Sequence, residues 1–223
     1  MQDTERKINR HKSLIDAYNR KNNTNIKYQI NEHNNNNFFN ISTKTINLSI
    51  VNYSNSFKII DNYISDEHID LYQVNDEESD FIFGHELGHA DFFENYPYNK
   101  YLIYSTLLVP LCFLNKKTII VAPLIFGINI LNNYVREFYA DLFSVQFFKH
   151  KNTSYLNKMD NQISFGLNCL KQNNKLAYLN GEFICLTDKF IHPSLEYRKY
   201  AINNFDLNQN ITIFNIFKSI FNI

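Results

Sequence analysis

Two histidines and a glutamate within five positions, His85, Glu86 and His89, are the residues of this chain best suited to chemistry. On a helix, residues four apart lie on one face with Cβ atoms about 5–6 Å apart, so both imidazoles can reach one metal ion. The glutamate between them faces the same cleft, where it can act as the base of a zinc hydrolase. We therefore expect a helical zinc site with His85 and His89 as ligands and Glu86 as general base. Because so short a pattern also arises by chance, a second group of residues has to support it.

The third metal ligand has to come from another part of the chain, because a catalytic zinc site normally has three protein ligands and leaves the fourth position to water. A third histidine six residues after His89 is excluded, since that position is Asn95. A later segment offers Glu137 and Asp141, which share a helical face beside an apolar stripe. This spacing predicts Glu137 as the third ligand and Asp141 as the acceptor for the free N–H of a ligating histidine. The alternative is a solvated acidic pair on a surface helix.

A third segment places His192 directly before Pro193, with Arg198 six residues after the histidine. Because proline often occupies the first position of a helix, His192 is expected near a helix mouth. By residue chemistry alone, a capping or surface role for His192 is as compatible with the sequence as a role in a functional site. Arg198 equally suits an ion pair with Asp141 or Glu196. These two residues therefore gain a role only in combination with the upstream motifs.

The three segments, in this order between residues 76 and 201, resemble the membrane-associated gluzincin endopeptidases that include the CAAX prenyl proteases and the HtpX-like heat-shock proteases. The resemblance implies a zinc metalloendopeptidase that acts on polypeptide substrates. It also implies one zinc ion held by His85, His89 and Glu137, with Glu86 as the base that works on a zinc-activated water.

The resemblance further implies that His192 and Arg198 help to hold the substrate or the developing oxyanion, which makes them catalytic candidates beside Glu86. Oxyanion stabilisation requires a donor aimed at the position where the charge develops. His192 is the first candidate for that donor, and Tyr139 and Tyr197 are weaker ones.

The elements that must position these residues give an α+β, mostly helical fold. Asn75 and Glu78 form a predicted capping box at the start of the metal-binding helix, and Gly88 within it makes sense only where another element, such as a helix, approaches closely. Helical spacing over about residues 5–20 predicts a first helix, and apolar alternation at 26–30 and 46–50 predicts two half-buried strands. We expect a small antiparallel sheet packed on the active-site helix.

Between the two metal-binding helices, residues 98–134 form a predicted apolar helical hairpin, with arms of about 14 residues around a polar tip at 115–117. Tyrosines at one end and lysines at the other suit a membrane interface. We therefore expect association with a membrane through 98–134, with the catalytic site facing the cytoplasm. A peptidase with a buried hairpin is the alternative, because short apolar helices are also common in protein cores.

Composition limits the remaining possibilities. The chain has 223 residues, of which 44% are hydrophobic, and this suits a single domain over 1–223. A net charge of zero argues against nucleic acid as a partner. The three cysteines, Cys112, Cys169 and Cys185, lack a metal-binding spacing. A different class of function remains open: a non-catalytic membrane or scaffold protein that keeps a structural zinc site.

Overall fold

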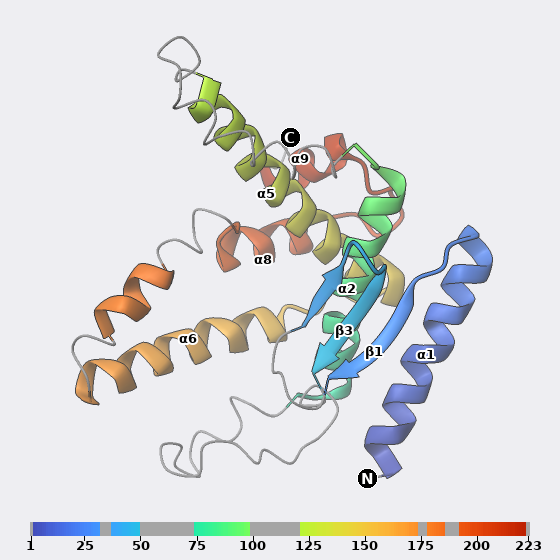
Figure 1. Cartoon of the computed structure of the whole chain (residues 1–223), viewed down its shortest axis with the longest axis horizontal. Coiled ribbons are helices and arrows are strands. Elements are labelled where there is room, and N and C mark those ends of the chain that lie inside the picture. Colours follow the sequence, from blue (N-terminus) through green and yellow to red (C-terminus); the bar gives the residue numbers. More distant parts are fainter. Residues whose placement is uncertain are drawn as a thin grey trace.

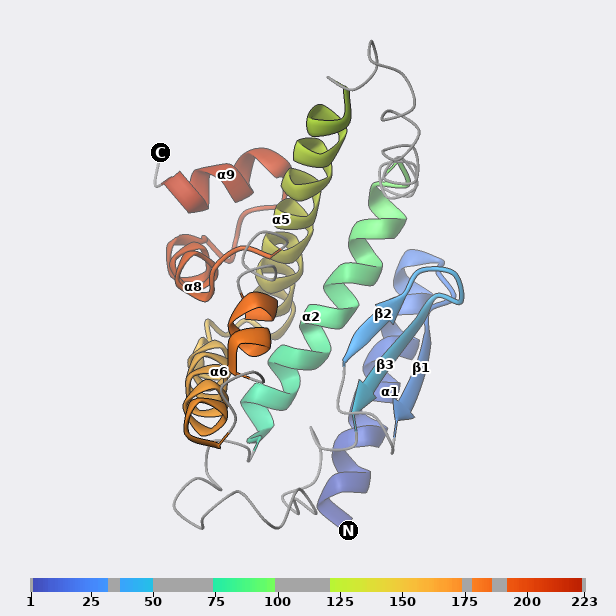
Figure 2. The same cartoon turned by 60° about the vertical axis from the view of Figure 1, so that its left-hand side comes forward.

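The computed structural model describes residues 2–31, 37–49, 74–98, 121–173, 178–185 and 192–221. The described part of the chain is mostly helical and carries one small sheet. Figure 2 shows helix α2 (Asp76–Asn95) in the middle of the molecule, with α1 (Gln2–Asn22) and the sheet on one side. The helices α5 (Val121–Phe148), α6 (Ser154–Asn173), α8 (Leu195–Asn204) and α9 (Ile213–Phe221) lie on its other side. The predicted mostly helical α+β class is confirmed.

The sheet contains three strands, β1 (Lys27–Asn31), β2 (Phe38–Asn40) and β3 (Thr45–Ser49), in the order β1-β3-β2. β2 pairs with β3 in antiparallel fashion, whereas β1 pairs with β3 in parallel (Figure 1). The sheet is therefore mixed, and the prediction of an antiparallel sheet is wrong. Apolar alternation identifies the buried face of a strand, but the direction of pairing depends on β2, which lies between the two predicted strands in the sequence.

Helix α2 begins as its sequence predicts. The Asn75 side chain accepts a hydrogen bond from the Glu78 backbone N–H at 2.8 Å, and the Glu78 carboxylate accepts one from the Asn75 N–H at 3.0 Å. This reciprocal capping box satisfies two of the free N–H groups at the helix start. Helical spacing predicts that five apolar side chains of α2 face the core, and all five are buried: Phe81, Ile82, Leu87, Ala90 and Phe93.

Two cores meet on α2, because this helix buries side chains on both of its sides. On one side, Leu87 packs with Ile15 of α1 and Ile46 of β3. On the other, Phe92 packs with Leu142 of α5 and Ile216 of α9. Because α2 packs against a core on each side, its backbone is held firmly in place and supports the side chains that it presents.

The contact between α2 and α5 depends on two glycines one turn apart, Gly84 and Gly88. A Cβ atom added at Gly88 would lie 2.7 Å from the Ala140 Cα atom and 2.9 Å from the Ala140 carbonyl oxygen. At Gly84, an added Cβ would lie 2.9 Å from the Ser144 Cα atom. The close approach expected at Gly88 is confirmed, and the neighbouring element is the second predicted metal-binding helix.

The Gly88→Ala variant is expected to lose about 1–3 kcal/mol of folding free energy, because its methyl group meets backbone that can move only with the whole helix. Gly127 of α5 is the matched control, since an added Cβ at this glycine has no atom within 4 Å. Gly127→Ala should gain up to about 1 kcal/mol from its higher helix propensity. Urea denaturation of both metal-free variants tests this pair, and equal stabilities would contradict the packing described.

The predicted hairpin at 98–134 falls largely on residues 99–120, which lie outside the described residues. What the structure describes of it, 121–134, is the continuous first half of α5, the helix that carries Glu137 and Asp141. Leu131, which belongs to the apolar stripe that the sequence predicts beside Glu137 and Asp141, is 61% exposed. The hairpin is therefore not seen as a separate insertion.

The expected membrane placement, with the site facing the cytoplasm, is wrong on this structure. Among the helices of the described residues, none is both long and apolar enough to cross a bilayer.

Candidate metal centre

The three predicted ligands converge between α2 and α5. The Nε2 atom of His85 lies 3.5 Å from Glu137 Oε2, and the Nε2 atom of His89 lies 3.5 Å from Glu137 Oε1. One ligand atom from each of the three residues falls within 4.8 Å of the others. Ligands at about 2.0–2.2 Å from a tetrahedral zinc ion are themselves about 3.4 Å apart, so the donor set has suitable spacing for one ion.

A buried network orients the first histidine. The Nδ1 atom of His85 lies 2.8 Å from Asp141 Oδ1, which leaves its Nε2 atom directed to the ligand cluster. Arg198 of α8 donates two hydrogen bonds to the Asp141 carboxylate, from Nε and Nη2, each at 2.7 Å. Such a fork holds a carboxylate in one orientation. Of the two partners considered for Arg198, the structure shows Asp141.

Burial and charge give His89 and Glu137 the protonation states that metal binding requires. Burial lowers the pKa of His89 well below its ordinary value, so its imidazole is neutral near pH 7. Burial lowers the pKa of His85 as well, but its hydrogen bonds to Asp141 and Glu137 outweigh burial and raise this pKa to about 9, so a metal ion has to displace a proton from His85. Burial alone would raise the pKa of Glu137, but the neighbouring imidazoles hold it well below the ordinary value of a carboxyl. For Asp141, the ion pair with Arg198 likewise outweighs burial and lowers the pKa. Glu137 is therefore an anionic ligand beside a neutral imidazole.

Glu86 is buried beside the ligands, with 6% of its surface exposed. Within the described residues, no hydrogen bond or ion pair to its carboxylate is found. Burial raises the pKa of Glu86 to about 7, against the opposing charge of His85. A carboxyl with a pKa near 7 can both accept and return a proton at neutral pH.

His192 lies at the edge of the ligand cluster, with its Nδ1 atom 3.5 Å from Glu137 Oε1 and its side chain 37% exposed. It is thus close to the expected position of a substrate. The weaker oxyanion candidates differ. The Tyr139 hydroxyl is buried and donates to Asp91, and Tyr197 is 61% exposed on α8.

Two side chains near the centre had no assigned role in the sequence. Tyr155 of α6 is partly buried and packs against Phe81. Burial and, to a smaller extent, the charge of Glu86 raise the pKa of the Tyr155 phenol to about 12. No sequence pattern links α6 to this site. The place of Arg136 near the centre could be predicted from the sequence, because Arg136 directly precedes the ligand Glu137.

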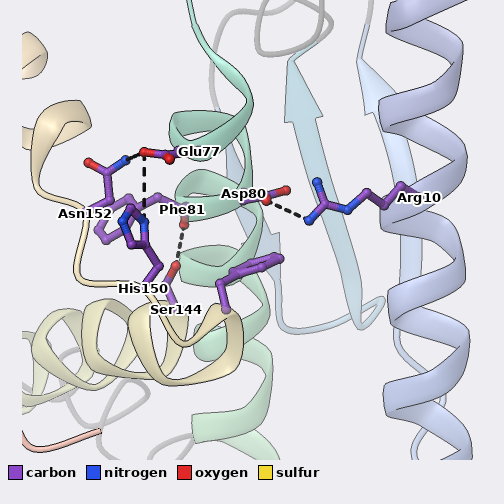
Figure 3. A pocket seen from close by; sticks show the side chains of 8 residues that line it. Arg10, Glu77, Asp80, Phe81, Ser144, His150 and Asn152 are labelled. Carbon is purple, nitrogen blue, oxygen red and sulfur yellow. Dashed lines mark hydrogen bonds and ion pairs between the residues drawn. The ribbon is translucent and has the colours of Figure 1, made fainter.

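A separate hollow of about 210 Å³ lies near the start of α2 (Figure 3). Its polar groups are largely paired with one another: Arg10 donates to Asp80 at 2.8 Å, and Asn152 donates to Glu77 at 2.9 Å. It shares no residue with the ligand cluster. We assign it no role in the chemistry of the metal centre.

Comparison of the chain with known protein families, with curated proteins and with solved structures finds no match. The resemblance to the gluzincin endopeptidases therefore stays a prediction from the sequence motifs.

Proposed function

We propose that this protein is a zinc-dependent metalloendopeptidase of the gluzincin type, with polypeptide as its substrate. The observation that carries the proposal is the convergence of His85, His89 and Glu137 around a position beside the buried carboxyl of Glu86. Two imidazoles and one carboxylate form the ligand set of several zinc peptidases, and they leave a coordination position for water.

The zinc ion, when bound, supplies Lewis-acid chemistry that lowers the pKa of a water molecule to about 7. Glu86 takes the proton of the attacking water and returns it to the leaving amine, which its raised pKa permits. His192 lies near the cluster and partly exposed, which suits a donor to the oxyanion of the tetrahedral intermediate.

Asp141 and Arg198 act through other residues and are positioning residues in this proposal. Asp141 fixes the tautomer of His85, and Arg198 fixes Asp141. Partners of this kind typically change metal affinity or activity by about 10–100-fold when they are removed. Because the Arg198 guanidinium is buried and bound to Asp141, the substrate-holding role that the resemblance implies for it is not part of the proposal.

A purely structural zinc site accounts less well for these residues. Structural sites are normally closed by four protein ligands, whereas within the described residues the cluster of possible ligands has three members. A structural site also has no use for Glu86, whose burial costs stability because no described residue forms a hydrogen bond with its carboxyl. An enzyme gains a base from the same arrangement.

Removal of zinc is expected to abolish peptide hydrolysis, and its return is expected to restore it. The purified chain is assayed on a mixed library of quenched fluorescent peptides before and after treatment with 1,10-phenanthroline, and again after dialysis against zinc. Hydrolysis that persists in protein shown to be metal-free would refute the proposed function.

A further inference from the structure

Arg136 is the cation of the metal centre that has no dedicated anionic partner within the described residues. Its Nη2 atom lies 3.8 Å from Glu137 Oε1, beyond hydrogen-bonding distance, and Glu137 is committed to the ligand cluster. Its Nε atom is buried and has no hydrogen-bond partner. By contrast, Arg198 donates two hydrogen bonds to Asp141.

A second unpaired donor lies one turn earlier on the same helix. The Nδ2 atom of Asn132 is also buried and without a hydrogen-bond partner, and residues four apart share a helical face. A buried donor that stays unpaired costs about 1–3 kcal/mol. Two such donors, one turn apart on the helix that carries Glu137, point to an acceptor that the described residues do not supply.

The charge balance of the centre points the same way. A divalent ion and Arg198 together offset the carboxylates of Glu86, Glu137 and Asp141 even when all three are ionised. Arg136 then leaves a surplus positive charge at the site. Its charge acts on both Glu86 and His89, and its side chain is 20% exposed, so part of it is accessible from solvent.

We propose that Arg136, assisted by Asn132, binds a carboxylate of the substrate next to the bond that is cleaved. A planar guanidinium pairs with a carboxylate through two parallel hydrogen bonds, which favours this anion over a neutral group. The carboxylate comes either from an aspartate or glutamate side chain or from a free C-terminus. This proposal rests on the proposed function and makes Arg136 a specificity-determining residue.

Binding, measured by calorimetry on zinc-loaded Glu86→Gln protein, tests the proposal without cleavage. The parent peptide is neutral and blocked at both ends. One set of peptides carries a single aspartate, moved position by position, and another peptide carries a free C-terminal carboxylate. We expect one of the two carboxylate sources to bind about tenfold more tightly than the parent, as a charged hydrogen-bonded pair allows. The preferred source identifies the kind of carboxylate that is recognised.

The added Arg136→Gln substitution is expected to remove this preference, so that the carboxylate peptides bind no more tightly than the neutral parent does to the same variant. Arg136→Lys should retain part of the preference, since lysine keeps the charge but loses the planar fork. Arg20→Gln on the exposed face of α1 is the control and should leave the preference intact.

Equal binding of neutral and carboxylate peptides by the Arg136-containing protein would overturn this proposal, and so would a preference that survives Arg136→Gln. These outcomes are separable from a failure of the proposed function. If the protein with Glu86 intact hydrolyses no peptide but the Arg136-dependent preference is present, the peptidase assignment fails and the carboxylate site stands.

Discussion

Glu86→Gln protein is expected to bind zinc like the unchanged protein and to hydrolyse peptides about 10³-fold more slowly, within the range that a positioned general base contributes. The amide keeps the shape of the side chain but cannot accept the proton of water. Because Glu86 is buried and is not one of the three clustered ligands, its replacement leaves the donor set in place. The value of kcat/KM on a fluorescent peptide and the zinc content of the same sample test both halves of the prediction.

Glu77→Gln is the matched control for this variant, because Glu77 lies on the same helix and its side chain is 64% exposed. We expect this control to keep full activity. A Glu86→Gln protein that retains both zinc and an unchanged kcat/KM would show that Glu86 is not the base.

The same variant has a second readout in the metal-free protein. Burial raises the pKa of Glu86 from 4.5 to about 7, so the folded state holds this proton more tightly than the unfolded state does. The protonated Glu86 is therefore compatible with full folding stability at low pH. The free energy of unfolding then falls as the pH rises from about 4.5 through about 7, because the buried carboxyl must ionise. Glu86→Gln should remove this loss, which denaturation of both metal-free proteins across that pH range would detect.

Glu137→Gln is expected to weaken zinc binding by more than about 100-fold, which exceeds the effect typical of a residue that only supports a ligand. Glu137 supplies both carboxylate oxygens that face the two imidazoles, each 3.5 Å from an Nε2 atom. The neutral amide removes the single anionic ligand of the set. Competition with a coloured zinc chelator measures the affinity.

Glu196→Gln on the exposed surface of α8 is the control for this experiment. Its zinc affinity should equal that of the unchanged protein. The far-UV circular dichroism of the metal-free Glu137→Gln protein should also be unchanged. A folded Glu137→Gln protein with full zinc affinity would mean that the ion binds elsewhere.

Much of the α2–α5 pair could be predicted from the sequence because its signals are local. The Asn75–Glu78 capping box depends on residues three apart, and the convergence of His85 and His89 depends on one helical turn. The sequence also predicts that another helix packs closely at Gly88, since a glycine inside a helix indicates close approach of a neighbouring element. Gly84, one turn earlier, carries the same signal for a close approach of another element.

The parts that could not be predicted depend on contacts between distant segments. The alternation at Ile46 and Leu48 defines a buried strand face but not the parallel pairing of β1 with β3. The apolar start of α5 resembles a membrane segment by composition, yet polar residues soon follow it in one continuous helix. Composition alone does not reveal that the apolar residues at 121–131 and the ligand-bearing residues that follow belong to one helix.

The same limit applies to the roles of individual site residues. The sequence left Arg198 with two acidic partners, and only the packing of α8 against α5 selects Asp141. Tyr139 is one of the weaker oxyanion candidates from the sequence, but its hydroxyl donates to Asp91 inside the core. Adjacent helical residues point in different directions, so nearness in sequence is a poor guide to nearness at a site.

The coordination of the bound ion is the most direct test of the proposed centre. A crystal structure of zinc-loaded protein, with anomalous diffraction recorded at the zinc edge, shows the ligands individually. We expect one zinc ion held by the Nε2 atoms of His85 and His89 and by the Glu137 carboxylate, with a remaining position open to solvent. Zinc closed by four protein ligands, or bound away from Glu137, would contradict the account.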